Sequence, residues 1–186
     1  MRMAGMHIVL GGGGAVGGAV VRELRAREEQ LIAVEYERAL PETETRLADA
    51  RDLEALLCAT EGASYIYQCI GLPYDSARWQ RDWPRIAEHV VSACTTHGAV
   101  LLYFDNAYLY GPPPLSVPVT EAHRRAPSSR KGAARKRAAD IVTHALGNGA
   151  VRGVIARSAD FYGPHARNSS LYISFLERML QGAAPQ

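Results

Sequence analysis

Cysteines and long apolar runs are scarce in this sequence. Its 186 residues include three cysteines, Cys58, Cys69 and Cys94, without a Cys-x-x-Cys pair. Their apolar or helical surroundings indicate reduced core thiols and therefore a cytoplasmic protein. No apolar run reaches the length of about 18 residues that a membrane span needs. Residues 1–6 are too short to be the apolar region of a secretory signal.

An excess of charge of one sign is also absent. Lysine and arginine together number 21 and the acidic residues 19, which gives a formal net charge of +2. No general attraction to nucleic acid or acidic membranes is therefore implied. The basic residues concentrate in segment 124–137, which lacks interleaved aromatics and is typical of a solvated helix face rather than a nucleic-acid site. The six histidines show no HxxxH or HExxH spacing, so no metal is expected.

Glycine, in contrast, is concentrated near the start of the chain. The short apolar run 7–10 is followed by Gly11, Gly14 and Gly17, and helical periodicity begins at once. A pyrophosphate can approach the backbone only where no Cβ intervenes, and a helix starting near Ala15 would point its free N–H groups and positive dipole end at the phosphates. This order of strand, loop and helix predicts a dinucleotide site.

The remaining pattern alternates strands with helices. Strands are expected at 7–10, 31–35, 45–48, 64–70, 99–104 and 151–156, and helices at 15–29, 52–59, 83–97, 130–146 and 171–180. The alternation predicts an α/β fold, a Rossmann-type doubly wound parallel sheet with helices on both faces, in a single domain over residues 1–186. Ligands of such sheets bind beyond the carboxyl ends of the strands, where we expect five loop positions to converge: Gly11, Glu35, Asp49, Gly71 and Asn106.

Four motifs occur in a fixed order along the chain. They are the glycine pattern, Asp49 after the third strand, the Phe-Asp-Asn-Ala-Tyr-Leu-Tyr-Gly segment at 104–111, and the segment 157–164 with Arg157 and a Tyr-Gly-Pro end. Together they resemble the NAD-dependent epimerase/dehydratase family, the extended short-chain dehydrogenases/reductases, over nearly the whole chain. The resemblance implies an oxidoreductase, epimerase or dehydratase that uses NAD or NADP on a nucleotide-sugar or similar small molecule.

Carried over by position, the resemblance also implies a cofactor site. Glu35 lies 18 positions after Gly17, close to the acidic residue about 20 positions on that holds the adenosine ribose. A carboxylate there favours NAD because it repels the 2′-phosphate of NADP. Arg38 is suited to bind that phosphate, so NADP stays as the alternative. The other cofactor contacts implied are Gly11, Gly14, Ala15, Val16 and Gly17 for the pyrophosphate, Asp49 and Ala50 for the adenine, and Cys69, Ile70 and Gly71 for the nicotinamide.

The catalytic positions depart from the family pattern. Members place a Ser or Thr after the fifth strand and a Tyr-x-x-x-Lys in the next helix, where the lysine lowers the tyrosine pKa for proton exchange. Here Asn106 occupies the Ser/Thr position, and residues 130–140 contain no tyrosine. If Lys136 matches the family lysine, Gly132 stands at the tyrosine position; shifted by one, Lys131 and Arg135 take the two places.

Two functions follow from this departure. In an enzyme, the candidate catalytic residues are Asn106, Tyr108, Lys131 and Lys136. Asn106 would polarise a substrate carbonyl, or simply cap its loop, and Tyr108 is the candidate for proton transfer. The alternative is a non-catalytic dinucleotide-binding sensor or regulator.

The end of the chain departs from the family as well. Members continue past the Tyr-Gly-Pro loop into a substrate lobe, whereas this sequence ends after one more expected helix. Most of that lobe is therefore expected to be absent, which would leave apolar surface exposed. A homodimer through the helices around Trp83 and Arg130 is a further expectation from the family.

Overall fold

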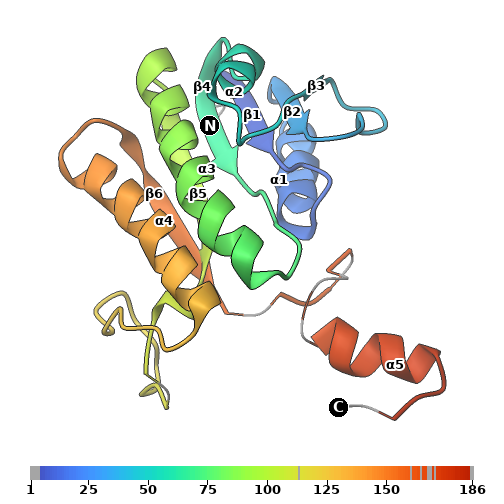
Figure 1. The fold of residues 1–186 in the computed structure, drawn as a ribbon. Coiled ribbons are helices and arrows are strands. Elements are labelled where there is room, and N and C mark those ends of the chain that lie inside the picture. Colours follow the sequence, from blue (N-terminus) through green and yellow to red (C-terminus); the bar gives the residue numbers. More distant parts are fainter. Residues whose placement is uncertain are drawn as a thin grey trace.

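The computed structural model describes residues 5–112, 114–159, 161–163, 165–166, 169 and 171–184. Its sheet has six parallel strands in the order β3-β2-β1-β4-β5-β6 (Figure 1). The strands are β1 (Met6–Leu10), β2 (Leu31–Glu35), β3 (Thr45–Leu47), β4 (Ala63–Gln68), β5 (Val100–Asn106) and β6 (Arg152–Ser158). This order reverses direction between β1 and β4, which is the topology of the Rossmann fold. The predicted fold class is therefore confirmed.

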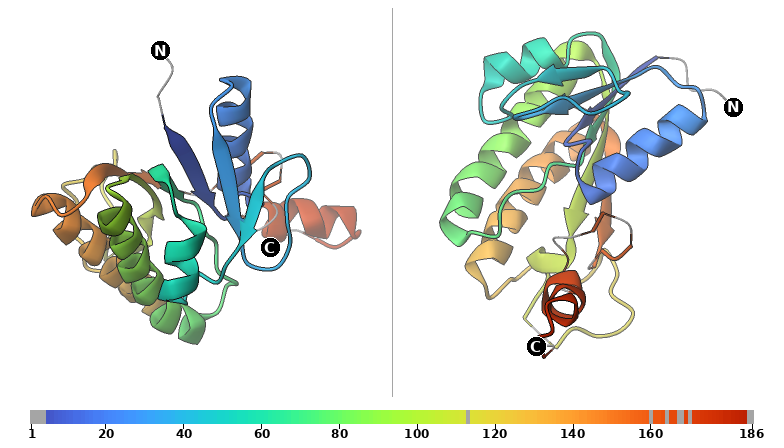
Figure 2. Two further views of the ribbon diagram at one scale, coloured as in Figure 1. Left: turned by 90° about the horizontal axis from the view of Figure 1, so that it is seen from above. Right: turned by 90° about the vertical axis from the view of Figure 1, so that its right-hand side faces the viewer.

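Helices cover both faces of the sheet. They are α1 (Ala15–Ala26), α2 (Leu53–Ala59), α3 (Ser76–His97) and α4 (Arg130–Gly147), with short turns η1 (Ala107–Leu109) and η2 (Tyr172–Leu176) and a final α5 (Glu177–Leu180). Figure 2 shows α1 on one face and α2, α3 and α4 side by side on the other. Side chains alternate between two cores, so Ile8 packs under α3 whereas its neighbour Val9 packs under α1.

Helix α3 begins earlier than its apolar periodicity indicates. The sequence predicts a start at Trp83, directly before Pro84, but the helix starts at Ser76 and holds Pro84 in its interior. Asp75 caps the new start by accepting the Arg78 N–H at 2.6 Å. Proline leaves the carbonyl four residues earlier without its helical donor. Arg137 of α4 supplies that donor, because its guanidinium lies 3.0 Å from the Gln80 carbonyl oxygen.

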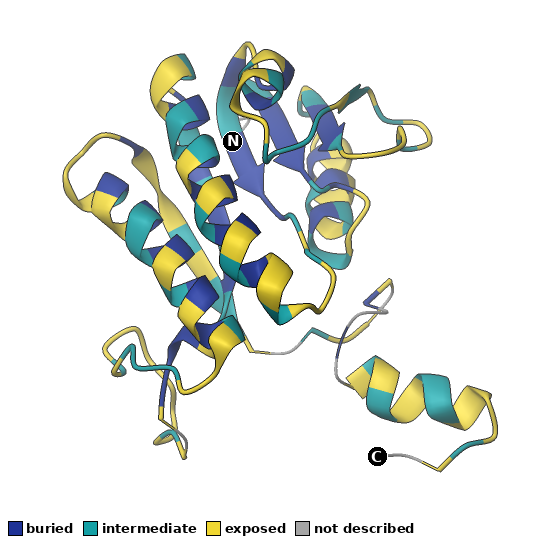
Figure 3. Cartoon of the chain, in the orientation of Figure 1, coloured by how far each residue is buried: buried dark blue, intermediate teal, exposed yellow. Residues whose placement is uncertain are grey.

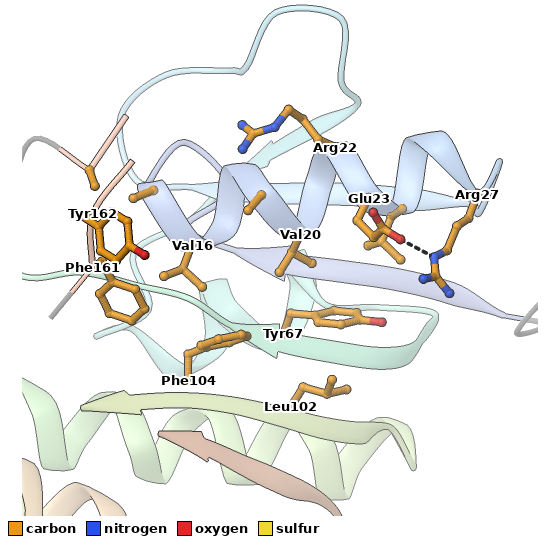
Figure 4. Close-up of a pocket in the computed structure, with 14 residues that line it drawn as sticks. Val16, Val20, Arg22, Glu23, Arg27, Tyr67, Leu102, Phe104, Phe161 and Tyr162 are labelled. Carbon is orange, nitrogen blue, oxygen red and sulfur yellow. Dashed lines mark hydrogen bonds and ion pairs between the residues drawn. The ribbon is translucent and has the colours of Figure 1, made fainter. Parts of the chain in front are cut away.

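Part of the α1 face of the sheet remains uncovered. A groove of about 620 Å³ lies between α1 and strands β4 and β5. Figure 4 shows Val16 and Val20 of α1 facing Tyr67 and Phe104 across it. Figure 3 shows the sheet buried at its centre, while much of α5 is exposed. Apolar surface is thus exposed in this groove. Within the described residues, no helix combines the length and apolar character needed to cross a bilayer.

Candidate functional site

The glycine loop packs tightly at the carboxyl end of β1. Gly11 has a φ of +77°, and a Cβ there would lie 2.9 Å from the Ile70 Cα in the segment after β4. A Cβ at Gly17 would overlap the Gly11 carbonyl oxygen. The Gly18 N–H donates to the Gly14 carbonyl oxygen at 2.8 Å as α1 begins. The structure therefore brings the predicted pyrophosphate and nicotinamide positions together.

Glu35 lies against this loop from the end of β2. Its Oε1 accepts the Gly13 N–H at 2.9 Å. Burial raises the pKa of Glu35, against the opposing hydrogen bonds from the Gly13 and Gly12 backbone. The predicted ribose residue is thus next to the predicted pyrophosphate loop, whereas Arg38 is exposed. Ala15 and Val16 lie at the start of α1 and also line the end of the apolar groove.

Glu35→Gln is expected to weaken NAD binding and to reduce the preference for NAD over NADP, because the amide no longer repels a 2′-phosphate. Only the ionised carboxylate accepts from both ribose hydroxyls, and burial raises the pKa of Glu35. NAD affinity should therefore fall as the pH is lowered. This fall should begin at a higher pH than the pKa of an ordinary glutamate would give, and the variant should not show it. Titrations with both cofactors across pH test this. Glu37→Gln, at an exposed position, is the control, and an unchanged cofactor ratio in Glu35→Gln would contradict the assignment.

The predicted adenine end already contains an internal ion pair. Arg51 donates to both oxygens of Asp49, from Nε to Oδ1 at 2.8 Å and from Nη2 to Oδ2 at 2.7 Å. These hydrogen bonds lower the pKa of Asp49. The Arg51 guanidinium also lies 5.3 Å from the ring centre of the exposed Tyr36. The Ala50 carbonyl oxygen accepts from His89 Nδ1 at 2.9 Å. The sequence analysis predicts Asp49 and Ala50 at this end but does not predict Arg51. The signal that could have indicated Arg51 is its position two residues after the aspartate.

At the opposite end of the site, a buried carboxylate joins two arginines. Asp105 Oδ1 accepts from Arg135 Nε at 3.0 Å, and Oδ2 accepts from Arg157 Nε at 3.0 Å. Asp105 and Arg135 are both buried, and the Arg135 guanidinium lies 3.9 Å from the Trp83 ring centre. Of the family motif at 157–164, positions 160 and 164 lie outside the described residues.

The structure separates the two alignments of helix α4. Arg135 is the side chain directed at the end of β5, whereas Lys136 is partly exposed and donates to Asp140 on its own helix at 2.7 Å. Position 132 has no room for a tyrosine, because a Cβ on Gly132 would overlap the Tyr108 carbonyl oxygen and lie 2.6 Å from the Pro127 Cβ. This packing favours the alignment in which Lys131 and Arg135 stand at the family's tyrosine and lysine positions.

Gly132→Ala is expected to destabilise the fold by about 1–3 kcal/mol, because α4 must move away from the loop after β5. Urea unfolding measures this change. Gly147→Ala is the control on the same helix, since nothing lies within 4 Å of its added Cβ, and it should be neutral or stabilising by up to about 1 kcal/mol. Equal effects of the two substitutions would show that the close approach at Gly132 is not tight.

Aromatic rings lie next to the Lys131 ammonium. The Lys131 Nζ lies 2.8 Å from the ring centre of Tyr74, in the segment after β4, and 5.9 Å from that of Trp79. The rings of Trp79 and Tyr108 stack with centres 5.9 Å apart. Asn106 Oδ1 accepts the Tyr108 N–H at 3.1 Å, so the loop-capping role is present and the amide N–H groups point elsewhere. Sequence reasoning missed Tyr74 and Trp79, because neither lies in a recognised motif.

The remaining candidate residues offer little chemical reactivity. Burial raises the pKa of the Cys69 thiol to about 12, so it remains protonated and is a poor nucleophile. Gly71 is exposed and lies in the segment after β4. Among the residues that the structure describes, no three His, Cys, Asp or Glu side chains gather as metal ligands.

The sheet order, the glycine loop after β1 and the acidic residue ending β2 define a Rossmann-type domain. The model of the NAD dependent epimerase/dehydratase family matches residues 7–186. The chain therefore belongs to this family, and the resemblance inferred from the four motifs is confirmed. Membership supports the predicted use of NAD or NADP. A search of the curated proteins finds no match.

Several solved structures share the fold. A short-chain dehydrogenase/reductase superfamily protein from Agrobacterium tumefaciens with bound NAD is 24% identical, with a TM-score of 0.74 over 82% of this chain and 48% of that protein. UDP-N-acetylglucosamine 4-epimerase from Bacillus cereus is 18% identical, with a TM-score of 0.81 over 96% of this chain and 62% of that enzyme. The dTDP-glucose 4,6-dehydratase from Streptomyces venezuelae with NAD bound is 17% identical, with a TM-score of 0.83 over 95% of this chain and 62% of that enzyme. This chain thus spans between 48% and 62% of their lengths.

Proposed function

We propose that this chain binds NAD along the carboxyl edge of its sheet. The close contact of Glu35 with the glycine loop is the observation that carries the proposal. Glu35 Oε1 lies 2.9 Å from the Gly13 nitrogen, so a ribose held by this carboxylate would place its pyrophosphate at the start of α1. Ile70 packs against Gly11, which puts the nicotinamide end beside the loop after β4. NAD is favoured over NADP for the electrostatic reason given above.

We further propose an oxidoreductase, epimerase or dehydratase activity on a nucleotide-sugar or similar small molecule. Bound NAD would supply the hydride acceptor for this activity, and the chain must hold the substrate oxygen and remove its proton. The amide N–H groups of Asn106 are suited to the first task because its Oδ1 is occupied by the loop. Tyr108, with 40% of its surface exposed, is the tyrosine available for the second. It would stand in for the missing tyrosine of the helix.

A specific observation favours the second candidate, a dinucleotide-binding sensor without turnover. In the usual site, the lysine cation promotes ionisation of the tyrosine. Here Arg135 has that position, and it is held by a hydrogen bond of 3.0 Å to Asp105, which also accepts from Arg157. An arginine also does not release its proton in this pH range. The proton relay of the family is therefore replaced by a fixed ion pair. The predicted homodimer remains a proposal in either case.

Tyr108→Phe separates the two functions. The protein is mixed with NAD⁺ and a panel of nucleotide sugars, and formation of NADH or of an altered sugar is followed. The enzyme proposal predicts turnover by the native chain and a loss of about 100-fold or more in the variant, because general acid–base catalysis contributes on that scale. NAD binding should be unchanged. Binding of NAD without turnover on any sugar would establish the sensor instead.

A further inference from the structure

Four of the seven cations in segment 124–137 are held by contacts within the chain. Lys136 and Arg125 both pair with Asp140, with nitrogen to oxygen distances of 2.7 Å. Arg135 is held by Asp105, and Arg137 donates to a main-chain carbonyl oxygen of α3. These contacts give Arg125, Arg135, Lys136 and Arg137 a structural role.

Lys131 differs from these four cations because its ammonium lies over aromatic rings. In the described part of the chain, the partners recorded for its ammonium are the rings of Tyr74 and Trp79 and include no carboxylate. Tyr74 and Trp79 meet edge to face, with ring centres 5.6 Å apart. A cation over an aromatic face stays charged and is held in place, but its charge is not cancelled as it is by a carboxylate. Lys131 thus presents a positioned and uncompensated positive charge.

This charge lies at the substrate end of the proposed NAD site. Lys131 is in the first turn of α4, directly before Gly132, which packs on the Tyr108 carbonyl oxygen after β5. Tyr74 comes three residues after Gly71 in the loop at the end of β4. Exposed fractions of 70% for Tyr74 and 40% for Tyr108 leave both rings accessible to a ligand. The cation and two accessible rings therefore share one rim of the crevice.

We infer that Lys131 binds a carboxylate on the sugar ring of the substrate, so that the preferred substrates are nucleotide-linked uronic acids. The inference rests on the proposed function. Charge-assisted hydrogen bonds from an ammonium to a carboxylate are about twice as strong as those between neutral groups. The exposed Tyr74 ring beside the ammonium offers apolar surface to the pyranose that carries the carboxylate. A diphosphate is served better by several convergent donors or by the forked guanidinium of arginine than by one ammonium between rings.

The test compares three ligands that differ only at the sugar. The NAD-loaded protein is titrated with UDP, UDP-glucose and UDP-glucuronate. The native chain should bind UDP-glucuronate about 10- to 100-fold more tightly than UDP-glucose, which is the range for a hydrogen bond to a charged group. Lys131→Met should abolish this difference and leave UDP affinity unchanged. Lys136→Met, on the same helix but paired with Asp140, is the matched control and should retain the preference.

The aromatic neighbour gives a second, independent readout. Tyr74→Phe keeps the ring under the ammonium and should retain the preference for UDP-glucuronate, whereas Tyr74→Leu should reduce it severalfold. Because Tyr74 is 70% exposed, neither substitution should change the unfolding temperature. Equal effects of the two variants would contradict the role given to the ring.

The other possible results of these titrations each contradict a different part of the proposal. Equal weakening of all three ligands in Lys131→Met would show that the lysine binds phosphate, and equal native affinity for UDP-glucose and UDP-glucuronate would show that it reads no carboxylate. Either result overturns the inference while the NAD site stands. Failure of every UDP ligand to bind the NAD-loaded chain would overturn the nucleotide-sugar assignment with it. Failure to load NAD would overturn the proposed function itself.

Discussion

Asp105→Ala should destabilise the protein by about 3–5 kcal/mol, because it leaves two cations at the end of β5 without their shared partner. Arg135 and Asp105 are both buried, and Arg157 Nε donates to the same carboxylate at 3.0 Å. An unpaired buried charge must either recruit water or force the helix and strand apart. Urea unfolding of native and variant chains measures the loss.

Asp140→Ala is the matched control for this substitution. Asp140 also joins two cations, Lys136 and Arg125, at 2.7 Å each, but its side chain is 42% exposed. Solvent-exposed pairs of this kind contribute about 0–1 kcal/mol. Similar losses in the two variants would mean that burial does not set the importance of the Asp105 cluster.

Gly17→Ala is expected to abolish NAD binding and to disturb the start of α1. An added Cβ would overlap the Gly11 carbonyl oxygen and lie 2.8 Å from the Gly12 Cα, so the loop and helix must separate. The main-chain N–H groups at the helix start would then no longer converge on one phosphate position. We expect NAD affinity to fall by about 100-fold or more, as the loss of several charge-assisted hydrogen bonds predicts.

Gly18→Ala provides the comparison one position along the same helix. Its Cβ would lie 3.3 Å from the Gly12 oxygen and 3.5 Å from a terminal nitrogen of Arg22, so a small shift accommodates it. NAD affinity in Gly18→Ala should remain within a fewfold of native. If Gly17→Ala also binds NAD normally, the glycine loop does not hold the pyrophosphate.

The sequence pattern predicted the sheet well because its signals are local. Short apolar runs ending in glycine or acidic residues fixed the strands at 7–10 and 31–35, and Asp52 caps α2 as expected, accepting the Ala55 N–H at 3.1 Å. Helix α3 begins seven residues before the predicted Trp83, because the prediction followed the apolar periodicity of residues 83–97 and the helix continues through Pro84. The compensating contact from Arg137 comes from another helix and has no local signature.

The catalytic end of the site illustrates a different limit. Basic residues occupy positions 130, 131, 135, 136 and 137 of α4, so spacing alone permits two alignments. Three-dimensional packing favours one of them, through the close approach of Gly132 to Tyr108 and the burial of Arg135 on Asp105. The aromatic neighbours of Lys131 come from the loop after β4 and from α3, far away in the sequence. Contacts of this kind depend on the fold and leave no pattern in the chain.

The most direct test of the account is calorimetric titration of the purified chain with NAD⁺, NADH, NADP⁺ and NADPH. The account predicts micromolar binding of the NAD pair, and weaker binding of the NADP pair because of the Glu35 carboxylate beside the loop. Absence of binding by all four cofactors would contradict the central claim that the glycine loop and Glu35 form a working dinucleotide site.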